Sequence, residues 1–166
     1  MSPKPVVMFE SQNIAEYKLE NSNRRITKIS NPGMNEFVFM NRKFSESGCS
    51  QISVRIVSNP LKSGISIGAA IESPNMKGEL LYRDGWIIYS GNRVHYEKGS
   101  SYSGGASLAE GQIVTVRVDV ASKTIIYLVD GVPTGPARTM NISDADIMNL
   151  KPAVQICFIG DGAEIV

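Results

Sequence analysis

The side chains that most often carry out acid–base chemistry or bind metals are scarce in this sequence. Its 166 residues include one histidine and one tryptophan, and both lie in the stretch GWIIYSGNRVHY, residues 85–96, as His95 and Trp86. A histidine can serve as a general base, but a nucleophilic triad also needs a serine and a carboxylate that orients the imidazole. We therefore interpret His95 as a strand residue that packs beside Trp86 and forms a local hydrogen bond, and we predict no catalytic residue.

The sequence also argues against a metal site. One histidine and two isolated cysteines, Cys49 and Cys157, are too few for a tetrahedral zinc site within one chain. The candidate acidic ligands lack the Asp-x-Asn-x-Asp-Gly spacing of a calcium loop; they are Asp144, Asp146, Asp161 and Glu164. Sandwich glycosidases need two carboxylates across a cleft, and their Glu-x-Asp strand motif is missing. We predict no metal, no cofactor and no enzymatic activity.

The residues between Trp86 and His95 predict a β-hairpin. Gly91-Asn92 lies between two apolar runs, and both residues tolerate the positive φ of a two-residue turn. The expected pairs are Ser90 with Arg93, Tyr89 with Val94, Ile88 with His95 and Ile87 with Tyr96. Residues in opposite positions share a sheet face. We expect core on the face with Ile87, Tyr89, Val94 and Tyr96, and a mixed face with Trp86, Ile88, Ser90, Arg93 and His95.

Short apolar runs bounded by turn residues recur along the chain, and several alternate as half-buried strands do. In QIVTVRVDV, residues 112–120, four valines share one face. The best candidate helix is SDADIMNL, residues 143–150, where Ser143 can cap one or two turns. The other predicted strands are 6–9, 37–40, 49–57, 64–71, 123–129, 153–159 and 163–166. This pattern predicts an all-β fold, either an antiparallel sandwich or a barrel.

The composition is typical of a soluble globular protein of one domain. A net charge of +1 gives no electrostatic reason to expect a nucleic-acid partner. We interpret the small basic cluster of Arg24, Arg25 and Lys28 as a solvated strand edge. No apolar run is long enough to cross a membrane, and the amino terminus lacks the pattern of a secretory signal. We expect a cytoplasmic location, with Cys49 and Cys157 as reduced thiols.

Five stretches follow one another in the order and at the spacing found in the SPRY domain family. They are SGCSQISVRI (47–56), GISIGAAI (64–71), DGWIIY (84–89), EGQIVTVRVDVASKTIIYLVDGVPTGPA (110–137) and LKPAVQICF (150–158). The chain departs from the family pattern at Ile52, where a tryptophan is usual, at Glu110-Gly111 and at Asp130-Gly131. It therefore resembles a divergent member of the family, without the motifs of the PRY segment.

The resemblance implies a bent two-sheet β-sandwich of concanavalin-like jelly-roll architecture, with no chemistry of its own. Residues 1–166 would form one domain, with edge strands in 1–46 and the SPRY core in 47–166. Trp86 would be the core tryptophan of the fold, so that the stretch around it is core and not an active site. Family members bind peptides or protein surfaces through loops at one end of the sandwich, often as the targeting or scaffold part of a larger assembly. We therefore expect a protein or peptide partner.

The resemblance also suggests where the partner binds. In some members an aromatic residue after the Pro-Ala-Val strand lines the peptide pocket, and Phe158 stands at that position, although it would equally fit the core face of its strand. The other wall of that pocket comes from the loop before the core tryptophan, here residues 73–84. Tyrosine within a Gly/Ser-rich loop, as in residues 99–105, is a further common contact. The predicted partner-binding residues are Leu81, Tyr82, Arg83, Tyr102 and Phe158.

A carbohydrate-binding lectin is the alternative from another class, because lectin sandwiches have related shapes. Lectins usually need a metal–carboxylate cluster or an exposed aromatic platform, and they are exported from the cell. The sequence shows neither the cluster nor an export signal, so the protein-interaction module is the favoured interpretation.

Overall fold

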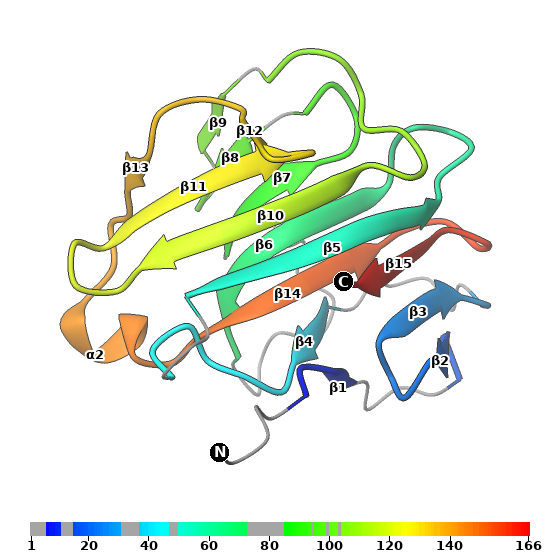
Figure 1. Cartoon of the computed structure of the whole chain (residues 1–166), viewed down its shortest axis with the longest axis horizontal. Coiled ribbons are helices and arrows are strands. Elements are labelled where there is room, and N and C mark those ends of the chain that lie inside the picture. Colours follow the sequence, from blue (N-terminus) through cyan, green and yellow to red (C-terminus); the bar gives the residue numbers. More distant parts are fainter. Residues whose placement is uncertain are drawn as a thin grey trace.

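The computed structural model describes residues 6–10, 15–30, 37–46, 50–72, 85–93, 95–98, 100–102 and 104–166. These residues form two antiparallel β-sheets and one short helix (Figure 1). The first sheet has the strand order β1-β4-β14-β6-β7-β8-β9. Its strands are β1 (Phe9–Glu10), β4 (Phe37–Met40), β6 (Ile65–Ile71), β7 (Gly85–Tyr89), β8 (His95–Glu97), β9 (Ser100–Tyr102) and β14 (Leu150–Ile156).

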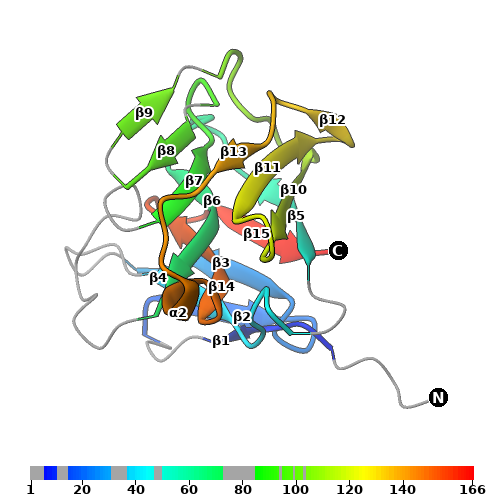
Figure 2. The same ribbon diagram turned by 90° about the vertical axis from the view of Figure 1, so that its left-hand side faces the viewer.

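The second sheet has the order β12-β11-β10-β5-β15-β3-β2, and β13 pairs with β11 outside this path. Its strands are β2 (Tyr17–Glu20), β3 (Arg25–Lys28), β5 (Gln51–Ser58), β10 (Ile113–Asp119), β11 (Thr124–Val129), β12 (Val132–Pro133), β13 (Arg138–Thr139) and β15 (Gly162–Ile165). Figure 2 shows the two sheets as separate layers. The predicted all-β sandwich is confirmed, and the barrel alternative is wrong because both sheets keep open edges in the described part of the chain.

The core lies between the sheets and is made by alternate residues of each strand. In β10 the even-numbered residues Val114, Val116 and Val118 are buried, whereas Arg117 and Asp119 are exposed. The alternating residues of β5 behave in the same way. Because successive side chains of a strand point to opposite faces, this period of two identifies the inner face of the second sheet, as predicted.

The hairpin that carries Trp86 and His95 has the predicted register but not the predicted faces. Ile88 lies opposite His95, and Ile87 lies opposite Tyr96. Trp86 and Ile88 belong to the core between the sheets, whereas Ile87 and Tyr96 belong to a smaller cluster on the other face. The prediction that the Ile87 face is the main core is therefore wrong. Both faces of β7 are covered, so the strand is apolar on both sides and its sequence does not distinguish them.

The turn of this hairpin is also shifted from the prediction. The residues with positive φ are Asn92 and Arg93, and Gly91 is not among them. Ser90 does not use its backbone to pair with Arg93. Its N–H donates to the carbonyl of Ile65, and its carbonyl accepts from the N–H of Leu108. The backbone of Ser90 therefore hydrogen-bonds the end of β7 to β6 and to the segment before β10.

The turns gather at two ends of the sandwich. The turn between β5 and β6 and the turn between β14 and β15 lie at the right-hand side of Figure 1, and α2 (Asp144–Ile147) lies at the left. The helix has the predicted cap, since the Ser143 side chain accepts a hydrogen bond from the N–H of Asp146 over 3.0 Å. No helix in the described residues is long and apolar enough to cross a membrane.

The amino-terminal segment contributes strands to both sheets. β1 is the edge of the first sheet and β2 the edge of the second, while β4 pairs with β14 and β3 pairs with β15. The strands β2 and β3 were not among those predicted from the sequence. Their charged residues hide the alternation, because Lys28 is buried on the core side of β3.

Candidate functional site

Three large apolar side chains are exposed at one end of the sandwich. Phe158 and Ile159 lie in the turn between β14 and β15, and Leu61 lies in the turn between β5 and β6. Their exposed fractions are 40% for Phe158, 62% for Ile159 and 66% for Leu61. We call these three residues the Phe158 end. Single exposed apolar residues are ordinary, but several on neighbouring turns are a feature of binding surfaces.

Phe158 is held in place by Gly64, so that the two turns form one unit. The Phe158 ring lies against the glycine so closely that any side chain at Gly64 would collide with it. Gly64 also has a φ of +87°, a conformation that favours glycine. The N–H of Cys157 donates to the Gly64 carbonyl over 2.8 Å, and the N–H of Gly64 donates to the Tyr89 hydroxyl over 3.1 Å. The ring is therefore positioned without being buried.

The position of Phe158 corrects the prediction for the strand before it. The strand predicted over 153–159 is β14, which ends at Ile156. Val154 and Ile156 are buried in the core between the sheets, as expected. Phe158 does not continue that face, because the chain leaves the sheet at Cys157 and turns, with the N–H of Asp161 bonded to the Phe158 carbonyl over 3.1 Å. The core interpretation of Phe158 is wrong.

The turn after β14 is also bonded to β3. The N–H of Gly160 donates to the Lys28 carbonyl over 2.8 Å, and the N–H of Lys28 donates to the Asp161 carbonyl over 3.0 Å. The Lys28 side chain is buried, and its Nζ lies 3.8 Å from a Glu16 carboxylate oxygen. The prediction of a solvated strand edge is wrong for Lys28. A buried ammonium needs an acidic partner, and Glu16 supplies it.

The other members of the predicted basic cluster are engaged as well. Arg25 lies 3.0 Å from the carboxylate of Glu164, and the guanidinium of Arg24 donates to the carbonyl of Ile165 over 2.9 Å. Asn21 donates a further hydrogen bond to Glu164. These arginines therefore hold β15 against the start of β3.

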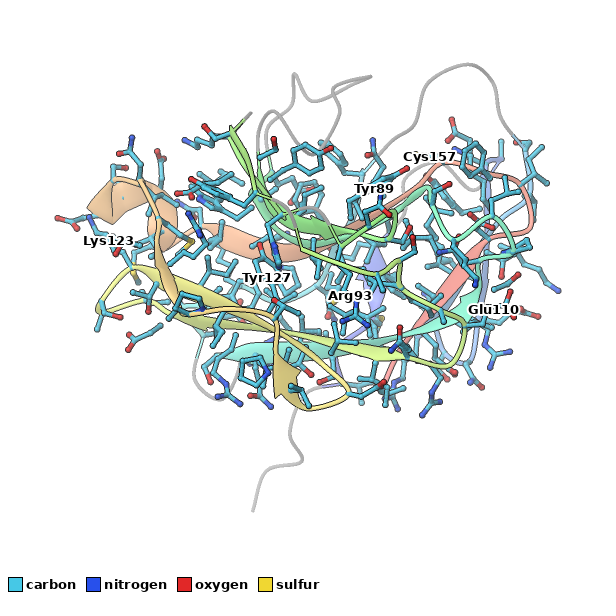
Figure 3. All side chains as sticks on the ribbon, turned by 90° about the horizontal axis from the view of Figure 1, so that it is seen from above. Tyr89, Arg93, Glu110, Lys123, Tyr127 and Cys157 are labelled. Carbon is cyan, nitrogen blue, oxygen red and sulfur yellow. The ribbon has the colours of Figure 1, made fainter. Side chains whose placement is uncertain are left out.

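A buried acid lies beside the Phe158 end. Asp161 is almost fully buried, and one of its carboxylate oxygens has no hydrogen-bond partner among the described residues. Burial, together with the negative charge of Glu110, raises the pKa of Asp161 to about 6. Burial also raises the pKa of Cys157, so this residue is a neutral thiol at pH 7. Figure 3 shows Cys157 and Glu110 at the same end of the molecule.

Tyr102, another predicted contact, lies away from Phe158. It ends β9, the edge strand of the first sheet, where it pairs with His95. The guanidinium carbon of Arg138 lies 3.5 Å from the centre of its ring. Since β7 and β8 separate β9 from β6, the structure does not bring Tyr102 together with Phe158.

The remaining predicted contacts, Leu81, Tyr82 and Arg83, lie outside the described residues. The strands that flank their loop are described. β6 ends at Ile71, which pairs with Leu150 at the start of β14, whereas Phe158 follows the other end of β14. The described strand residues nearest to 73–84 on either side, Ile71 of β6 and Gly85 of β7, therefore lie at the opposite end of β6 from Phe158.

Comparison with solved structures identifies the fold. No family model matches this sequence, and no curated protein matches it. A human SPRY domain superposes with a TM-score of 0.69 at 14% identity, over 95% of this chain and 95% of that chain. The SPRY domain of human HERC1 superposes with a TM-score of 0.63 at 20% identity, over 90% of this chain and 91% of that domain. The TRIM65 PSpry domain superposes with a TM-score of 0.72 at 11% identity, over 96% of this chain and 91% of that domain. This chain has the SPRY fold.

Trp86 is the buried tryptophan of this SPRY fold, with 1% of its surface exposed. His95 is half-buried on the neighbouring strand. Its Nε2 lies 2.9 Å from the Thr134 hydroxyl, and its ring centre lies 5.2 Å from that of Tyr127. Burial, and then the positive charge of Arg138, lower the pKa of His95, which is neutral at pH 7. The prediction that His95 is a packed strand residue is confirmed, but the prediction of a local hydrogen bond is wrong, because the bonded Thr134 lies 39 residues along the chain and the ring packs against Tyr127 of the second sheet.

One serine pattern was missed from the sequence. GISIG, residues 64–68, has the Gly-x-Ser-x-Gly spacing of a nucleophile elbow. In the SPRY fold this stretch belongs to β6, and Ser66 is buried inside the sheet, not raised on a strand-to-helix turn. Ile65 faces the core, so Ser66 points to the outer face, whereas His95 shares the inner face with Ile88. The two side chains lie on opposite faces of the sheet and do not form a nucleophile–base pair.

Two residues of the Phe158 end were not predicted as contacts. Leu61 follows Asn-Pro, and Ile159 precedes Gly-Asp-Gly. Both are apolar residues inside a turn sequence, and because turns lie on the surface, this pattern could have predicted that the two side chains are exposed. Within the described part of the SPRY fold, no three histidine, cysteine, aspartate or glutamate side chains gather to hold a metal ion.

Proposed function

We propose that this chain is a non-catalytic protein-interaction module that binds a peptide or protein surface through the Phe158 end. The observation that carries the proposal is the exposure of Phe158, Ile159 and Leu61 on two turns that are bonded to each other and to β3. The SPRY fold supports it, since the family resemblance implies binding through loops at one end of the sandwich.

The geometry suits a binding anchor for two physical reasons. Burying an aromatic or aliphatic side chain in a partner contributes roughly 1.5–3 kcal/mol. Binding also costs free energy when flexible groups become ordered. The Phe158 ring is already restrained by Gly64, and its turn is restrained by Lys28, so little further ordering is needed. Such a preorganised aromatic residue is typical of an interface hot spot.

The proposal has two further parts. Leu81, Tyr82 and Arg83 form an additional group of partner contacts, since tyrosine and arginine are enriched among residues that dominate binding energy. The module works in the cytoplasm as one domain over residues 1–166, as a targeting or scaffold part of a larger assembly. The predicted reduced state of Cys49 and Cys157 would fit that compartment.

The experiment is a pull-down from the native cytosol with the whole chain as bait. The wild type is compared with the double variant Phe158→Ser, Ile159→Ser and with the control Val132→Ser. Val132 is 66% exposed on β12, the edge strand of the second sheet farthest from β2, so it is as exposed as Ile159 but lies away from the Phe158 end. We expect one set of proteins to be recovered by the wild type and the control, and lost from the double variant.

The bound protein is then identified and its affinity measured with purified components. A partner that binds the double variant as tightly as the wild type would contradict the proposed surface. Turnover of a substrate by the purified chain would contradict the non-catalytic part. Recovery of glycans without protein would favour the lectin alternative.

A further inference from the structure

A second candidate site lies where the two sheets approach each other at their β9 and β12 edges. A cleft of about 150 Å³ opens there. It is lined by His95 and Tyr102 of the first sheet, by Tyr127 and Arg138 of the second, and by the Thr134–Pro136 segment between β12 and β13. Figure 2 shows β13 between β8 and β11, which closes this side of the sandwich.

The cleft is built from a ladder of residues on the inner face of the first sheet. Ile88 pairs with His95, and His95 pairs with Tyr102. These three side chains share one face and lead from the buried core to the exposed edge. The cleft is therefore continuous with the rigid core on one side and open to a ligand at Tyr102.

Arg138 presents its charge in the cleft. Its guanidinium lies over the Tyr102 ring at 3.5 Å, a stacked arrangement that leaves the N–H groups at its edge available. The Nε atom is buried and has no hydrogen-bond partner among the described residues. Glu97 is the nearest acid, but its carboxylate oxygen is 3.9 Å from this nitrogen, which is too long for a hydrogen bond.

Tyr127 supplies a second donor without an acceptor. The side chain is 5% exposed, and its hydroxyl has no partner among the described residues. Figure 3 shows Tyr127 between the two layers. A buried hydroxyl without a hydrogen-bond partner destabilises the folded chain, so we infer that a group from outside the chain accepts this hydrogen bond.

We propose that this cleft is a binding site for a carboxylate group of a peptide, held by the guanidinium of Arg138 and the hydroxyl of Tyr127. A carboxylate offers two acceptor oxygens, which match the Arg138 Nε–H and the Tyr127 O–H, two donors without a hydrogen-bond acceptor among the described residues. The stacked Arg138 is restrained before binding, which reduces the entropy lost on association. This site lies beyond the proposed Phe158 surface and does not depend on it.

The surrounding charges favour a carboxylate over other groups. One guanidinium beside Glu97 gives little net positive charge, which is less than a doubly charged phosphate needs. A cationic side chain of a ligand would be attracted by Glu97 and by the face of the Tyr102 ring. Arg138 already lies over that ring and beside Glu97, so the cleft has no free place for a second cation. His95 is held by Thr134 and lies beside the site as a reporter.

The test is a titration of the isotope-labelled whole chain by NMR with capped tripeptides. The probes are Ac-Gly-Glu-Gly-NH₂, its neutral isostere Ac-Gly-Gln-Gly-NH₂, the cationic Ac-Gly-Lys-Gly-NH₂, and Ac-Gly-Gly-Gly-OH with a free terminal carboxylate. We expect saturable shifts of the Arg138 Nε–Hε and His95 ring signals, with at least tenfold tighter binding of a carboxylate probe than of the glutamine probe. The glutamate and terminal-carboxylate probes distinguish a side chain from a chain terminus.

Matched variants separate binding from folding. Arg138→Gln should abolish binding of the carboxylate probes, and Tyr127→Phe should weaken it about fivefold, since only the hydroxyl is lost. Arg117→Gln, an exposed arginine on β10, should bind as the wild type. The Phe158→Ser, Ile159→Ser variant should also bind these probes normally, so failure of one site is distinguishable from failure of the other. Equal binding of the glutamine probe, tighter binding of the lysine probe, or unchanged binding in Arg138→Gln would overturn the proposal.

Discussion

The buried carboxyl of Asp161 gives the sharpest quantitative prediction. Its pKa is raised from 3.8 to about 6 in the folded chain, first by burial and then by Glu110. A raised folded pKa means that the folded state holds the proton more tightly than the unfolded state. Between about pH 4 and pH 6 the unfolded state therefore loses its proton first, and the stability falls as the pH rises through this window.

The size of the effect follows from the two pKa values. Each pKa difference of one corresponds to about 1.4 kcal/mol, so the interval from 3.8 to about 6 sets an upper limit of about 3 kcal/mol. The Asp161 side chain is buried, but it directly follows the exposed residues 158–160, so nearby water and salt partly screen its interaction with Glu110. We therefore expect Asp161→Asn, which removes the charge but keeps the shape, to be more stable than the wild type by roughly 1–2 kcal/mol above pH 6.5. At pH 4 the two should be nearly equal.

The assay is urea unfolding followed by Trp86 fluorescence, at intervals between pH 4 and pH 8. Other carboxylates titrate equally in both proteins, so the difference between the two curves isolates Asp161. Glu110→Gln is the matched control, because the amide oxygen can still accept the hydrogen bond from Asn59 while the charge is removed. Above pH 6.5 the unfolding free energy of Glu110→Gln should lie between those of the wild type and Asp161→Asn. A variant that is less stable than the wild type at pH 7, or a constant difference across the pH range, would refute the reasoning.

Three further predictions concern the core, the loop and the thiols. Trp86→Ala should lower the unfolding free energy by roughly 3–5 kcal/mol in urea denaturation, because a fully buried ring leaves a cavity; a melting temperature within a few degrees of the wild type would contradict this. Tyr82→Ala or Arg83→Ala should weaken partner binding by more than ~1–2 kcal/mol in calorimetry without changing the melting temperature, and wild-type affinity in both would remove these residues from the site. After alkylation without reductant, mass spectrometry should show both Cys49 and Cys157 modified. A disulfide bond between them would instead indicate an oxidising compartment.

The candidate surfaces show where prediction from the sequence stops. The family resemblance made Phe158 a candidate, because some members carry a pocket aromatic at that position, but whether it lay in the core or on the surface depended on where β14 ends. That end is set by the turn that joins Asp161 to β3, a contact between residues more than 130 positions apart in the sequence. Leu61 joins the same surface only because Gly64 receives the Phe158 ring. No local sequence pattern predicts these long-range contacts of Asp161 with β3 and of Phe158 with Gly64.

Features that depend only on neighbouring residues follow directly from the amino-acid sequence. The alternating valines of β10 specify a strand with one buried face, because successive side chains point to opposite sides. Asp130-Gly131 specifies the two-residue turn between β11 and β12, since both residues adopt positive φ, at 50° and 79°. Ser143 specifies the start of α2, because its side chain can accept the free N–H of the first turn.

Which surfaces face each other follows from the packing of the two sheets and not from local sequence. The sequence around Trp86 is apolar on both faces of β7, so only packing against the second sheet makes the Trp86 face the main core. Arg138 and Tyr102 are ordinary polar positions in the sequence, and they line one cleft only because the fold brings Arg138 of β13 over the Tyr102 ring of β9. Local sequence fixes the direction of each side chain relative to its own strand. Long-range pairing of strands fixes what that side chain meets, and the free energy of those contacts is absent until the sheets assemble.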